Sequence, residues 1–168
     1  MQHSESIEYP LTKQFFNETV KPTVDEYLNE TENIRRGRLA AIVIYHLEDY
    51  WRADTNQKIH DELQTKTFIQ GNASHSSADI IRDLANASKH AELTHKKETP
   101  PTLTHANQIK QDMIGAFGTA PIGTLAFGTI RPVGVSVVLD DEQRFSLSYV
   151  IQQMMDVWRE LLKITPQQ

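Results

Sequence analysis

The sequence predicts a mainly α protein: a helical bundle with a small antiparallel β element inserted before the C-terminal helix. Apolar residues recur at helical spacing in several segments, which predicts helices. Glycines gather in residues 115–128, and valines then alternate with other residues, as is typical of turns followed by a strand. Because the chain has 168 residues, we expect one domain with a helical part (1–92), a glycine-rich β element (105–146) and a closing helix (147–164).

The first two helices are predicted from the spacing of their apolar residues. The first begins at Pro10 and is expected to kink at Pro22, because proline cannot donate the helical hydrogen bond. Its apolar face is expected to contain Leu11, Phe15, Val20, Val24 and Leu28. The second is the most apolar helical segment of the first half, so we expect it to be central. Its buried face is expected to contain Leu39, Ile42, Val43, His46, Leu47 and Tyr50.

Two further helices are predicted on either side of a polar loop. A third helix is expected within residues 56–70, ended by Gly71, and the polar residues 72–77 are expected to form a loop. A fourth helix is expected to begin with Ser77 as its N-cap and Asp79 in the first turn, where a carboxylate complements the helix dipole. Its buried face is expected to contain Ile80, Leu84, Ala87 and Ala91.

The last third of the chain predicts a β element and then a helix. The tetrapeptide AFGT occurs at residues 116–119 and 126–129, which we interpret as turns joining short strands. Alternating apolar residues over 133–139 predict a strand, and residues 144–147 are expected to pair back to it after a polar turn. The closing helix is predicted by the stripe Val150, Ile151, Met154, Met155, Trp158, Leu161 and Leu162.

Composition excludes several classes of function. The formal net charge of −5 gives no overall attraction to nucleic acid or to an anionic membrane. The chain has no cysteine, which excludes disulfide scaffolds, thiolate zinc sites and cysteine nucleophiles. Phosphate-loop and dinucleotide fingerprints are missing, so we expect no cofactor. The N-terminus lacks the features of a secretory signal, and we expect a cytoplasmic protein with no membrane partner.

His46 is the first candidate functional residue, because an imidazole on the apolar face of a helix needs a polar partner. Asp49 lies three residues further on and is expected to share one side of the helix with it. A hydrogen-bonded histidine in the core is one interpretation. A site residue in a polar pocket is the other.

Arg82–His90 is the second candidate region, because polar residues recur there at helical steps: Asp79, Arg82, Asp83, Asn86 and His90. A solvated face explains such a stripe in the simplest way. The alternative is a polar pocket between this helix and the His46 helix. In an antiparallel pair of helices, His46, Asp49, Asn86 and His90 would converge, with Asp83 also in the pocket.

An arginine, an adjacent polar residue and a downstream histidine on one helix resemble the motif of the HEPN superfamily of helical ribonucleases. Here Arg82 is followed by Asp83, and seven residues separate it from His90, one more than that motif has. The resemblance implies metal-independent RNA cleavage, with Arg82 binding phosphate and His90 acting as the base beside Asn86. The DLANASKH helix, the late VVLDD strand and the Trp158 helix also resemble a family of uncharacterised bacterial and phage-type helical proteins.

The sequence leaves three functions open. We expect a non-catalytic binding protein, acting through the polar pocket or through the glycine-rich ribbon on a protein partner or a second copy of the chain. The first alternative is the HEPN-like ribonuclease, with RNA as its substrate. The second is a metal site between helices. Its ligands would be His46, Asp49 and His90, but the function that we expect involves no metal.

Overall fold

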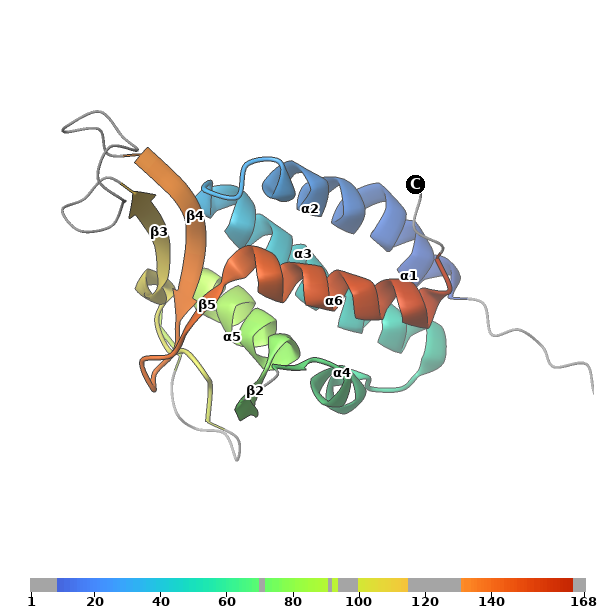
Figure 1. Cartoon of the computed structure of the whole chain (residues 1–168). Helices are drawn as coiled ribbons and strands as arrows, with labels where there is room; N and C mark the ends of the chain where they lie inside the picture. The colour runs from blue at the N-terminus through green and yellow to red at the C-terminus, as the bar shows by residue number, and fades with distance from the viewer. Residues whose placement is uncertain (1–8, 70–71, 91, 94–99, 115–130, 165–168) are drawn as a thin grey trace, which may run out of the picture.

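The computed structural model describes residues 9–69, 72–90, 92–93, 100–114 and 131–164, and most of these residues are helical (Figure 1). This confirms the mainly α prediction. The helices are α1 (Pro10–Phe15), a π-helical turn η1 (Phe16–Val20), α2 (Lys21–Leu28), α3 (Ile34–Thr55), α4 (His60–Lys66), α5 (Ser77–His90) and α6 (Leu147–Leu162). Helix α3 contacts α1, α2, α5 and α6, which confirms that it is the central helix.

The strands form two small antiparallel sheets. One pairs β1 (Phe68–Ile69) with β2 (Asn72–Ser76). The other, at one end of the helices in Figure 1, has the order β3-β4-β5, with β3 at Ile109–Ile114, β4 at Arg131–Val138 and β5 at Arg144–Ser146. The strand predicted over 133–139 and its pairing with 144–147 are confirmed, since Val137 faces Phe145 across the ladder. The two AFGT segments lie outside the described residues.

The loop predicted at residues 72–77 was wrong, because 72–76 form β2. Strand β2 pairs with β1, which ends the preceding helix earlier than expected, so α4 covers only His60–Lys66. Helix α5 begins at Ser77, and its N-cap contact comes from Ser76, whose hydroxyl accepts from the backbone N–H of Asp79 at 3.1 Å. The cap therefore lies one residue before the predicted one, while Asp79 is in the first turn as expected.

The buried face of the N-terminal helices differs from the predicted one because of η1. Pro22 has no N–H to donate to a carbonyl one turn back, and the π-helical turn lies immediately before it. Because a π-helical turn contains more residues than an α-helical turn, it changes which residues of the following helix point towards the core. Val20 and Val24 are buried as predicted, but Leu11 is 47% exposed, and Phe16 and Tyr27 are buried in place of Phe15 and Leu28.

The predicted buried face of α3 was correct at Leu47 and wrong at other positions. Leu39 and Tyr50 are exposed, and the buried positions are Gly37, Ala40, Ala41, Ile44, Leu47 and Trp51. The small residues at the start of this face let neighbouring elements come close. A Cβ at Gly37 would lie 2.7 Å from Cδ2 of Leu147 and 3.1 Å from Cε2 of Tyr27, both fully buried.

The core lies between α2, α3, α5, α6 and one face of the three-stranded sheet. The predicted faces of α5 and α6 are confirmed at nearly every described position, with Leu161 only half-buried. Ala91 lies outside the described residues. Trp158 is completely buried and meets Trp51 edge-on, with ring centroids 6.0 Å apart.

We predict that Gly37→Ala destabilises the protein, although alanine is favoured over glycine in a helix by about 1 kcal/mol. The added methyl group would overlap Leu147, and overpacking of a core costs about 1–3 kcal/mol. Chemical denaturation of both proteins measures the difference. In a Leu147→Ala background the same substitution should be neutral or stabilising, and a stabilising effect in the wild-type background would contradict the steric argument.

Candidate functional site

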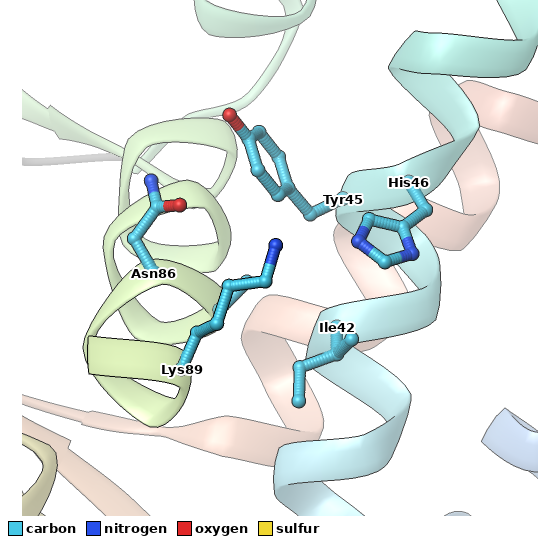
Figure 2. Close-up of a pocket in the computed structure, with 6 residues that line it drawn as sticks. Ile42, Tyr45, His46, Asn86 and Lys89 are labelled. Atoms are coloured by element: carbon cyan, nitrogen blue, oxygen red, sulfur yellow. The ribbon is translucent and has the colours of Figure 1, made fainter. Parts of the chain in front are cut away.

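A groove between α3 and α5 brings together two of the residues predicted to share a pocket. His46 lines it from α3 and Asn86 from α5, as Figure 2 shows. The groove has a volume of about 100 Å³, and its remaining lining residues are Ile42, Tyr45, Ala85 and Lys89. The lining positions follow from helical spacing, because residues three or four apart lie on one face of a helix.

Two of the four polar side chains of this groove have no hydrogen-bond or ion-pair partner among the described residues. Neither His46 nor Lys89 makes a hydrogen bond or ion pair there, and the Lys89 chain extends from α5 towards α3 (Figure 2). Asn86 interacts with the phenol of Tyr45. Burial, followed by the charge of Glu48, raises the pKa of Tyr45, so its hydroxyl remains protonated and can donate. The groove therefore presents hydrogen-bond donors over an apolar floor.

The interpretation of His46 as a core histidine was wrong, because its side chain is only half-buried and lines the groove. The buried face of α3 runs through Ala40, Ile44 and Leu47, which leaves His46 beside it and partly exposed. Asp49 does not line the groove: its side chain is 65% exposed and pairs with Arg52 at 3.3 Å.

The other predicted site residues lie elsewhere along α5. Asp83 is buried and binds the Arg82 guanidinium, with Nε to Oδ1 at 2.8 Å. It also accepts from the backbone N–H of Thr102 at 2.6 Å. His90 is exposed at the end of α5, eight positions beyond Arg82, which in a helix is roughly 12 Å along the axis. The helix therefore does not bring Arg82 and His90 together.

A buried ionic network precedes the groove along α5. His60 of α4 lies between two carboxylates, with Nδ1 2.9 Å from Oε1 of Glu48 and Nε2 3.2 Å from Oδ1 of Asp79. Arg82 also donates to Oδ1 of Asp79 at 2.8 Å, and Gln64 donates to Oδ2 at 2.8 Å. The solvated-face interpretation was wrong for Asp79 and Asp83, whose side chains are 7% and 4% exposed.

The network shifts the pKa values of its members in opposite directions. Hydrogen bonds to Asp79 and Glu48 raise the pKa of His60 to about 9, so the ring is positively charged at neutral pH. Burial alone would raise the pKa of Asp79, but hydrogen bonds from His60, Gln64 and Ser76 hold it well below its usual range. Each carboxylate thus faces positive groups, and the charge of Arg82, whose Nη1 lies 3.0 Å from Nε2 of His60, partly offsets the rise in the pKa of His60.

Sequence reasoning missed His60, Glu48, Gln64 and His75. The Ser76-x-x-Asp79 pattern resembles a capping box and was the one local signal of a polar cluster at this helix start. The remaining contacts join residues 12 to 66 positions apart. Among the described residues no cluster of three or more histidine, aspartate or glutamate side chains is arranged to hold a metal ion. In the same part of the chain, no helix combines the length and apolar character needed to cross a membrane.

We predict that part of the stability of the protein is lost at alkaline pH through His60. Because its pKa is raised on folding, its contribution is complete below the ordinary value of about 6.5 and is lost as the pH rises through about 9. A shift of this size corresponds to about 3 kcal/mol. Urea unfolding of the wild type and of His60→Gln between these pH values measures it. The same pH dependence in both proteins would contradict the assignment.

Comparison with known proteins adds no relative from which a function can be transferred. No family model, curated protein or solved structure matches the chain. The chemistry of its own side chains is therefore the basis for inferring its function.

Proposed function

We propose that the protein is a non-catalytic binding protein and that the α3–α5 groove takes a small molecule with an anionic group on an apolar body. The observation that carries this proposal is that His46 and Lys89 line one groove with no hydrogen bond or ion pair among the described residues, beside the interacting pair Tyr45 and Asn86. Charged residues that stabilise the fold nearby are paired, as in the His60 network. Unpaired donors facing a groove are available to a ligand.

The donors of the groove determine the charge of the ligand. The Lys89 ammonium supplies a positive charge and donors only, and the protonated Tyr45 phenol adds another donor. The Glu48 carboxylate, whose charge raises the pKa of Tyr45, is 15% exposed and pairs with His60. A carboxylate or phosphate would therefore meet more donors than acceptors here.

The walls and the size of the groove determine the rest of the ligand. Ile42 and Ala85 give an apolar surface beside the polar side chains. A volume of about 100 Å³ is several times what one water needs and below the roughly 150 Å³ that encloses a benzene ring. The groove is therefore large enough for an anionic head and the adjoining apolar atoms, with the remainder of the ligand outside.

The ribonuclease alternative gains no support from the neighbourhood of Arg82. Phosphate binding needs a free guanidinium, and this one already donates to Asp79 and to both oxygens of Asp83. The distance along α5 also separates it from His90. Binding by a neutralised arginine would require breaking buried ion pairs, which costs about 3–5 kcal/mol.

Two expectations about the architecture also remain proposals: the bundle arrangement of the helices and the insertion of the β element. We infer that the helices form a bundle and that the β3–β5 sheet is an insert before α6, an interpretation supported by the central position of α3. A cytoplasmic location, a protein partner and a homodimer remain predictions.

We predict that phenyl phosphate binds the groove and that Lys89→Met weakens its binding. Loss of one charge-assisted hydrogen bond should raise Kd about tenfold. Titration followed by NMR shifts of Tyr45, His46 and Asn86 measures both affinity and location. Lys58→Met removes the same charge from an exposed position outside the groove and should leave Kd unchanged.

Two further probes test separately whether the anionic group and the apolar body of the ligand contribute to binding. Benzyl alcohol lacks the anion, and inorganic phosphate lacks the apolar body. Both should bind more weakly than phenyl phosphate. Shifts that are absent from the groove, or an equal loss of affinity in Lys89→Met and Lys58→Met, would contradict the proposed function.

A further inference from the structure

A second and larger groove lies beyond the N-terminal end of α5. It has a volume of about 310 Å³, within the size range of small-molecule sites. It is formed where the residues before α5, the segment at residues 100–102 and the turn after β4 meet. Its lining residues are Gln64, His75, Asp79, Arg82, Pro100, Pro101, Thr102, Asp140 and Asp141.

The carboxylates of this groove exceed its positive charges. Three aspartates line it against one arginine; Asp79 is balanced by His60 and Arg82, which leaves the carboxylates of Asp140 and Asp141. Oδ1 of Asp140 accepts from Thr104 and Gln108, while its Oδ2 has no partner among the described residues. Asp140 lies at the exposed rim, where a ligand can reach it.

The neutral groups also offer acceptors. The Nε2 amide of Gln64 is used on Asp79, which leaves Oε1 of Gln64 without a donor in the described part of the chain. The hydroxyl hydrogen of Thr102 is used on Asp83, which leaves the lone pairs of its oxygen. The lining therefore retains acceptors after its internal hydrogen bonds are made.

His75 is an independent sign that the groove is incomplete. The residue is only 8% exposed, and its Nε2 lies 2.6 Å from Oδ2 of Asp141. Because a carboxylate only accepts, Nε2 carries the proton, and in the neutral ring Nδ1 is then an acceptor. This Nδ1 is buried and has no hydrogen-bond partner among the described residues. An unpartnered buried polar atom is costly to the fold, and in the neutral ring a donor that reaches Nδ1 would remove this cost.

We propose that this groove binds an alkylammonium group, the protonated primary amine of a small organic molecule or of a lysine side chain. An ammonium group brings three donors and one positive charge to a lining that offers acceptors and excess negative charge. Pro100 and Pro101 provide apolar surface for the adjoining carbon chain. The proposal is independent of the α3–α5 groove, because the two grooves share no lining residue.

Titration with n-butylammonium, followed by NMR, tests the proposal. The side-chain amide of Gln64 and the backbone amides of Thr102, Asp140 and Asp141 should shift in a saturable way. The matched neutral probe n-butanol should give no saturable shift there. Asp140→Asn keeps Oδ1 as an acceptor for Thr104 and Gln108 and removes only the charge, so it should fold and raise Kd about fivefold.

Asp156→Asn is the matched control, because it removes the same charge from an exposed position on α6 outside the groove. It should bind as the wild type does. No saturable shift at the groove, equal binding of n-butanol, or unchanged affinity in Asp140→Asn would overturn the proposal. A parallel titration with Nα-acetyl-lysine amide distinguishes the source of the amine, since the tighter of the two probes identifies it. Shifts at Tyr45, His46 and Asn86 report on the other groove and separate the two proposals.

Discussion

The carboxylate of Asp79 is the point on which the surrounding structure depends. It accepts hydrogen bonds from the cap residue Ser76, from His60 and Gln64 of α4, and from Arg82 of its own helix. Through these contacts one buried charge joins α4, the end of β2 and α5, which lie close together along the chain. Removing a partner from a buried pair leaves an uncompensated charge, so the members of the network constrain one another. Asp83 extends the same constraint to the segment at Thr102.

This constraint divides the polar surface of α5 into two parts. Near the start of the helix, the polar side chains are committed to one another and hold α3, α4 and α5 together. One turn further on, Asn86 and Lys89 line a groove beside α3. Asn86 interacts there with Tyr45, and Lys89 makes no hydrogen bond or ion pair among the described residues. The same helix thus combines a rigid polar base with side chains that are free to meet a ligand, an arrangement that favours a preorganised site.

Much of the fold follows from the sequence where large apolar residues carry the signal. The face of α6 was predicted because its stripe is long and regular, and β4 because its valines alternate. The face of α3 was not, because Gly37, Ala40 and Ala41 bury little area and look less hydrophobic than exposed Leu39. Strand β2 was missed because its residues have low strand propensity and its structure comes from pairing with β1.

The candidate site was predictable to a similar extent. His46 and Asn86 were correctly brought together because both follow from helical spacing and the pairing of two helices. His60 and His75 were missed, because their partners lie far away in the sequence and no local pattern signals them. Side-chain networks between elements are in general set by tertiary packing rather than by local spacing.

The junction between β5 and α6 has a mechanical consequence. The strand ends at Ser146 and the helix begins at Leu147, with no connecting loop between them. Leu147 is fully buried and lies against the backbone of α3 at Gly37, which fixes the first turn of α6 against the central helix. On this side the sheet is therefore joined to the helical core without an intervening loop, so a displacement of β5 would be passed directly to the first turn of α6.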